Sequence, residues 1–147
     1  MSVAPLLAEP ALYDYKGKEY KVHPWTYEVQ GKFEQYLKKR AWEAYAESEK
    51  HLGQDAADRA MAATLKDIAT GYYSFGSDGV GKALQAPEHV RYIFWLCLRK
   101  HDGAVTQEQV RSMTETGDDY QAAIRIMNVA NTDPNLRAPR EGAPQTS

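Results

Sequence analysis

Apolar side chains recur at helical spacing along most of this chain. Between about residue 26 and residue 52 they return every three or four positions, with lysines and glutamates between them. These positions are Val29, Phe33, Tyr36, Leu37, Ala41, Ala44 and Tyr45. The period predicts one long amphipathic helix over residues 26–52. A narrower stripe from Ala57 to Ile68 predicts a second helix over residues 55–70, whose small side chains favour close approach of a neighbouring helix.

Four further helices are predicted in the second half of the chain. Their ranges are about 79–85, 87–100, 107–116 and 119–131. Pro87 suits the first turn of its helix, and the middle of that helix, Val90–Leu98, is apolar nearly all round. We therefore expect this helix to be central and covered on most sides. Thr106 followed by Gln109 fits a capping box, and Asp118 is expected to cap the last helix.

The two ends of the chain have different patterns. Two short runs with aromatic residues flank Lys16-Gly17-Lys18 and predict a β-hairpin over residues 12–23. Residues 132–147 contain three prolines and one large apolar side chain, so we expect a flexible tail. The whole pattern predicts a mostly α protein, with one compact multi-helix domain over residues 1–131, a small N-terminal β-hairpin and a flexible C-terminal tail.

Composition narrows the classes of function. The chain has 147 residues, a length typical of one domain, with 43% hydrophobic and 26% charged residues. Its net charge of −2 gives no broad attraction for a phosphate backbone, so nucleic-acid binding is not expected. The longest apolar run, Tyr92–Leu98, has seven residues, whereas a bilayer span needs about 20. With one cysteine and no secretory signal, the chain is expected to be soluble and to work in a reducing cytoplasm.

One string resembles a nucleotide-binding loop. Residues 76–83, GSDGVGKA, match the P-loop pattern except at Ala83, which replaces the serine or threonine whose hydroxyl would hold magnesium. A P-loop also follows a buried parallel strand, whereas Thr70–Phe75 is polar and aromatic and follows a predicted helix. The favoured interpretation is a glycine-rich loop that leads into a short helix. A P-loop-like nucleotide binder is kept only as a third hypothesis, and no cofactor is predicted.

The residue types that carry catalysis and metal binding are scattered along the chain. The histidines, His23, His51, His89 and His101, include no pair with the i, i+4 spacing of a helical metal site. Cys97 lies in the most apolar predicted helix, where a thiol acts as a small hydrophobe and burial raises its pKa. No catalytic or metal-binding residue is therefore predicted, and the chain is not expected to be an enzyme.

Aromatic residues are the best candidates for binding a partner. Tyr72, Tyr73 and Phe75 cluster in a predicted loop between two glycines rather than on a helical stripe. Exposed aromatic side chains favour protein interfaces, although a loop that fills the core is the alternative. We predict that these residues, together with Trp25 and Tyr27, contact a partner protein.

Several features also follow one another in a suggestive order. A Lys-Gly-Lys hairpin precedes Pro24-Trp25 and a long helix, and then come the GYYSFG loop, the helix end LCLRK at residues 96–100 and the helix start VTQE at residues 105–108. Over roughly residues 12–130 this order resembles the tail assembly chaperones of long-tailed bacteriophages. The resemblance implies a small helical protein of the host cytoplasm with no catalytic residues. It implies binding of the long, apolar tape measure protein, and of tail tube subunits, while the tube assembles.

The leading hypothesis is accordingly a non-catalytic protein-binding protein, a phage tail assembly chaperone that keeps the tape measure protein soluble during tail tube assembly. Such a cover is physically reasonable because a long protein with apolar stretches aggregates when those stretches are exposed. The alternative is a structural subunit of a virion or another large assembly. The sequence leaves open whether copies of the chain form a homo-oligomer.

Overall fold

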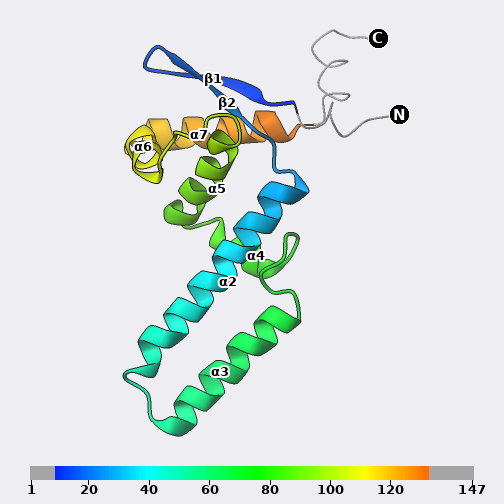
Figure 1. Cartoon of the computed structure of the whole chain (residues 1–147), viewed down its shortest axis with the longest axis vertical. Coiled ribbons are helices and arrows are strands. Elements are labelled where there is room, and N and C mark those ends of the chain that lie inside the picture. Colours follow the sequence, from blue (N-terminus) through cyan, green and yellow to red (C-terminus); the bar gives the residue numbers. More distant parts are fainter. Residues whose placement is uncertain (1–8, 133–147) are drawn as a thin grey trace, which may run out of the picture. The chain divides into compact units, whose positions relative to one another are not determined.

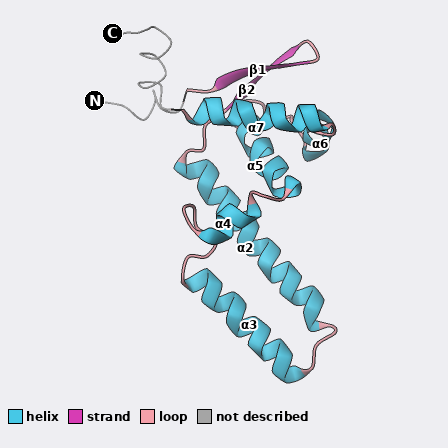
Figure 2. Cartoon of the chain, turned by 180° about the vertical axis from the view of Figure 1, so that it is seen from behind, coloured by secondary structure: helices cyan, strands magenta, loops and turns pink. Residues whose placement is uncertain are grey.

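The computed structural model describes residues 9–132 and contains, within them, six helices and one two-stranded antiparallel sheet (Figure 1). The strands are β1 (Ala11–Tyr15) and β2 (Lys18–Val22). The helices are α2 (Tyr27–Glu49), α3 (Gln54–Ala69), α4 (Asp78–Ala83), α5 (Pro87–Arg99), α6 (Gln107–Met113) and α7 (Gly117–Asn131). The expectation of a mostly helical protein with an N-terminal β-hairpin is confirmed (Figure 2). The predicted flexible tail, after its first residue, lies outside the described residues.

Two compact units make up the chain. The described part of unit 1 comprises residues 9–29 and 90–132, and unit 2 is Gln30–His89. The sequence predicts a single helical domain over residues 1–131. The division between the units falls inside α2 and α5. Because the helical periodicity continues through both points, no local sequence signal marks the division.

The β-hairpin of unit 1 is closed by a tight turn. Lys16 and Gly17 have positive φ angles of 49° and 82°, as a two-residue turn requires when its twist matches that of the strands. The hairpin lies against α7, and the Tyr13 ring meets the Phe94 ring edge-on, with 6.1 Å between the centroids. This packing supplies the support that an isolated two-stranded hairpin lacks.

Helix α5 forms the centre of unit 1, as its apolar sequence predicts. Its buried side chains are Val90, Ile93, Phe94, Leu96, Cys97 and Leu98. The Trp95 indole donates a hydrogen bond to the Val105 carbonyl at 2.9 Å, and the Arg91 guanidinium donates to the hydroxyl and carbonyl of Thr114 at 2.8 and 3.0 Å. Within residues 9–132, neither α5 nor any other helix has the length and apolar character needed to cross a membrane.

The helix ends agree with the sequence in one case and differ in another. The capping box formed by Thr106 and Gln109 at the start of α6 is confirmed. The prediction that Asp118 caps the last helix is wrong, because the Thr116 hydroxyl accepts the hydrogen bond from the Asp119 amide at 3.1 Å. Asp118 instead lies in the first turn of α7. Threonine and aspartate are both good N-caps, so the local sequence does not decide between adjacent candidates.

Unit 2 contains most of α2 together with α3, α4 and the loop between them. In both views α2 and α3 run antiparallel to each other (Figures 1 and 2). Its buried hydrophobic side chains are Phe33, Leu37, Ala57 and Val80. The sequence predicts that the α3 stripe packs closely on a neighbouring helix, but only Ala57 of that stripe is buried, while Met61 and Leu65 are 40% and 51% exposed. The prediction of close packing along α3 is therefore wrong beyond its first turns.

Candidate functional site

The aromatic loop of residues 71–76 is half-buried rather than fully exposed. The Phe75 ring packs edge-on against the Phe33 ring, with 5.9 Å between the centroids, and the Phe75 amide donates a hydrogen bond to the Glu34 carboxylate at 2.8 Å. Tyr72 and Tyr73 form a T-shaped pair with 5.1 Å between the centroids. Phe75 thus holds the loop against α2.

Glycines give this loop its conformation. Gly71 and Gly76 both lie in the left-handed region, with φ angles of 80° and 90°, which other residues rarely adopt. Gly79 is buried against Tyr72, and a Cβ atom at that position would overlap the Tyr72 carbonyl oxygen. The loop and the start of α4 are therefore packed together as one piece.

The P-loop-like string of residues 76–83 forms this glycine-rich loop and the short helix α4, as the favoured interpretation of the sequence expects. Within the described part of the chain, helix α3 precedes the loop, and the only strands are those of the N-terminal hairpin. The Ser77 hydroxyl accepts the Val80 amide at 3.4 Å, and the Gly81 amide donates to the Ser77 carbonyl at 3.2 Å. The Val80 and Gly81 amides are therefore paired with Ser77, whereas the amides of a P-loop are directed at a phosphate.

Trp25 and Tyr27 stand at the start of α2, in unit 1. Tyr27 is 90% exposed, whereas Trp25 is half-buried and its backbone amide donates a hydrogen bond to the Asn131 side chain at 2.6 Å. The other predicted partner-binding residues, Tyr72, Tyr73 and Phe75, belong to unit 2. Two of the five predicted partner-binding residues therefore belong to unit 1 and three to unit 2.

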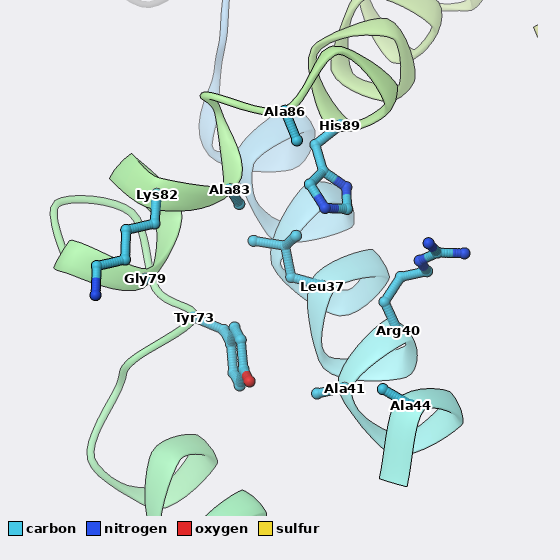
Figure 3. A pocket seen from close by; sticks show the side chains of 10 residues that line it. All are labelled: Leu37, Arg40, Ala41, Ala44, Tyr73, Gly79, Lys82, Ala83, Ala86 and His89. Atoms are coloured by element: carbon cyan, nitrogen blue, oxygen red, sulfur yellow. The ribbon is translucent and has the colours of Figure 1, made fainter. Parts of the chain in front are cut away.

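An open groove of about 400 Å³ lies within unit 2 (Figure 3). Its apolar side is formed by Leu37, Ala41 and Ala44 on α2 together with Ala83 and Ala86. Tyr73, Gly79, Lys82, His89 and Arg40 complete the lining. In the close-up, Lys82 and Arg40 stand on opposite sides of the apolar residues. Of the residues predicted to bind a partner, only Tyr73 lines this groove.

The polar groups of the groove differ in charge. The Arg40 guanidinium pairs with the Glu88 carboxylate at 2.9 Å. Burial lowers the pKa of His89, despite the opposing effect of Glu88, so this imidazole is neutral at pH 7. Burial, with a smaller contribution from Asp67, raises the pKa of Tyr73, so its hydroxyl keeps its proton. The charges on the lining are therefore the cations of Lys82 and Arg40, and no carboxylate lines the groove.

The sequence alone does not reveal this groove. Leu37, Ala41 and Ala44 follow the helical stripe that normally marks a buried face, so their pattern suggests core rather than surface. In the sequence, Lys82 is a candidate binding residue only as the lysine of an incomplete P-loop pattern. One feature of the sequence does point to the groove. The apolar stripe of α2 continues with alanine at positions 41 and 44, where a covered helix face usually carries larger side chains.

Histidines and the cysteine do not combine into a reactive site. His23 Nδ1 and His101 Nε2 lie 2.8 Å apart, a pairing that the sequence spacing does not suggest. Among residues 9–132, no group of three or more histidine, cysteine, aspartate or glutamate side chains is arranged to hold a metal ion. Burial raises the pKa of the Cys97 thiol to about 12, outweighing the opposing effect of a hydrogen bond with Trp25. This thiol therefore stays protonated and packs as a small apolar side chain.

Comparison of the chain with protein-family models, with curated proteins and with solved structures finds no match.

Proposed function

We propose that this chain is a non-catalytic protein-binding protein, a tail assembly chaperone of a long-tailed bacteriophage. It covers apolar segments of the tape measure protein in the host cytoplasm until tail tube subunits replace it. The proposal is supported by the sequence resemblance and by the surface of unit 2. It does not depend on any reactive side chain.

The observation that carries the proposal is the uneven burial of apolar side chains. Unit 2 has four buried hydrophobic residues, against fifteen in the described part of unit 1, although the two are of similar size. On α3, Met61 and Leu65 remain 40% and 51% exposed, and the groove beside α2 is lined by five aliphatic side chains. Apolar surface left uncovered by a protein's own fold is typical of sites that bind another protein.

Such a surface would prevent aggregation of the tape measure protein by binding its apolar segments. A tape measure protein with long apolar stretches self-associates unless a partner covers them. A cover that must later leave should bind with moderate affinity, which an open and shallow apolar surface provides better than a deep pocket. Helical segments can lie on such a surface through residues spaced three and four apart.

Co-expression with the tape measure protein of the same phage tests the proposal. We expect the soluble fraction of the tape measure protein to rise with the wild-type chain and to fall again with Leu65→Gln, which removes an exposed apolar side chain of unit 2. The matched control is Leu12→Gln on β1, since Leu12 is 58% exposed but belongs to unit 1. A tape measure protein that stays equally insoluble with and without the wild-type chain would refute the chaperone function. Retention of the chain in purified particles would favour the structural-subunit alternative.

A further inference from the structure

The groove of unit 2 combines two features that small-molecule sites rarely share. It is open to solvent, and three of its apolar residues, Leu37, Ala41 and Ala44, are spaced i, i+4 and i+7 along one helix. They extend for about 10 Å along the axis of α2 at the helical rise of 1.5 Å per residue. Pockets for small molecules instead enclose about 70–90% of the ligand. Leu37 is only 4% exposed, whereas Ala41 is half-buried and Ala44 is exposed. A row of this kind along a helix is a surface on which the ridge of a second helix can pack.

The charges beside the row are both positive. Arg40 already pairs with Glu88, whereas Lys82 has no ion-pair partner among the described residues. The Tyr73 hydroxyl adds a neutral hydrogen-bond donor to the same lining. A partner that fits the apolar row therefore meets free cationic charge at its edge, which favours carboxylates next to its apolar ridge.

From this arrangement we infer that the groove binds an amphipathic helix of a partner protein, in which a ridge of apolar side chains is flanked by glutamate or aspartate. The apolar ridge packs on Leu37, Ala41 and Ala44, and a flanking carboxylate pairs with Lys82. The inference rests on the proposed protein-binding function and names the chemistry of the segment that is bound. It also gives Lys82 a role that does not involve a nucleotide.

Reversing the charge of a groove residue and of the flanking residues of a peptide tests the inference. Two fluorescein-labelled helical peptides share one leucine and alanine ridge, flanked by glutamates in one and by lysines in the other. Binding to the full chain is followed by fluorescence anisotropy. We expect the wild type to prefer the glutamate peptide, and Lys82→Glu to weaken that binding by about threefold to tenfold while strengthening binding of the lysine peptide, because the ion pair is solvent-exposed.

Two matched controls separate the groove from the general surface. Lys66→Glu makes the same change of charge on α3, outside the groove, and should leave both affinities unchanged. Ala44→Gln and Ala46→Gln both alter exposed alanines of α2, but only Ala44 lines the groove. We expect Ala44→Gln alone to weaken binding of the glutamate peptide by at least about threefold, since it places a polar side chain in the apolar row. Circular dichroism establishes that each variant is folded.

Several outcomes would overturn the inference. These are equal affinity of the wild type for the two peptides, no measurable binding of either, or equal effects of Lys82→Glu and Lys66→Glu. A dimer in sedimentation equilibrium that Ala44→Gln dissociates would assign the groove to a second copy of the chain instead. If co-expression still keeps the tape measure protein soluble while the peptides fail to bind, the groove assignment fails and the proposed function stands. If the peptides bind as expected but the wild type rescues no tape measure protein, the proposed function fails instead.

Discussion

The two units of this chain bury very different numbers of apolar side chains, although each exposes three large ones. Unit 1 buries large side chains such as Phe94, Ile93 and Leu98 around α5. Unit 2 buries few, and it leaves Met61 and Leu65 largely exposed on α3. Since burying one large apolar side chain contributes about 1.5–3 kcal/mol, unit 1 gains far more from its own core. Unit 1 therefore has the larger hydrophobic core of the two.

The difference in buried apolar side chains between the units follows the composition of α5 in unit 1 and of α3 in unit 2. Helix α5 carries aromatic and branched aliphatic residues on most sides, so neighbours on every side gain by covering it. Helix α3 is rich in alanine, and its larger apolar residues are Met61, Leu65 and Ile68. It therefore carries fewer large apolar side chains than α5, and it buries only Ala57.

Matched leucine substitutions give the largest expected contrast between the units. Leu98 in unit 1 is 1% exposed and Leu65 in unit 2 is 51% exposed. We expect Leu98→Ala to lower the free energy of unfolding by about 2–5 kcal/mol, because it removes transfer energy and leaves a cavity. Leu65→Ala should change it by no more than about 0.5 kcal/mol. Urea denaturation followed by circular dichroism measures both values, and similar losses from the two variants would abolish the distinction between the units.

A pair of glycines on α4 tests whether the loop of unit 2 is well packed despite the small core. A Cβ atom at Gly79 would overlap the Tyr72 carbonyl oxygen, whereas one at Gly81 would meet no atom within 4 Å. We expect Gly79→Ala to cost about 1–3 kcal/mol of unfolding free energy through overpacking. Gly81→Ala should be neutral or stabilise by up to about 1 kcal/mol, because alanine favours a helix. Thermal unfolding of the two variants checks this, and equal melting temperatures would show that the loop is loosely held.

The smallest effect expected is a pH dependence, to which His23 and His101 of unit 1 contribute beside His89 of unit 2. Burial lowers the pKa of both His23 and His101 from the usual 6.5, and nearby cations lower each further, Lys100 for both and Lys21 for His101. At His23 the neighbouring His101, whose Nε2 lies 2.8 Å from His23 Nδ1, lowers the pKa further, and Glu28 opposes the shift. As the pH falls, the unfolded state therefore takes up protons before the folded state does. The stabilisation that comes from the neutral imidazoles should be complete above about pH 6.5. Below that pH the free energy of unfolding should decrease.

Urea denaturation between about pH 7.5 and pH 5, followed by circular dichroism, measures this decline. His101→Gln removes one of the two rings and should flatten the profile. His51→Gln, at an exposed position in unit 2, should leave the profile as in the wild type. A steeper decline in His101→Gln than in the wild type would contradict the assignment of the effect to the pair.

Much of the secondary structure could be predicted because its signals are local. The hairpin was expected over residues 12–23 and spans Ala11–Val22. The helix expected over residues 87–100 is Pro87–Arg99, since Pro87 and an apolar run mark it directly. The predicted partner-binding residues remain predictions, and the structure shows only how their side chains pack. Tyr73 does line the groove, but Phe75 packs against Phe33, because a loop's aromatic pattern does not say which ring faces inward.

By itself, the amino-acid order determined where helices and strands form and that α5 would be the covered helix, because hydrophobic period, caps and turns act between residues close in the chain. Tertiary structure alone decided that α2 and α5 are divided between two units, that Met61 and Leu65 of α3 stay exposed and that His23 meets His101, 78 positions away. It also placed Arg40 and Lys82 on either side of one apolar row. Such pairings depend on which helix faces find a partner during folding, and local periodicity carries no information about that choice.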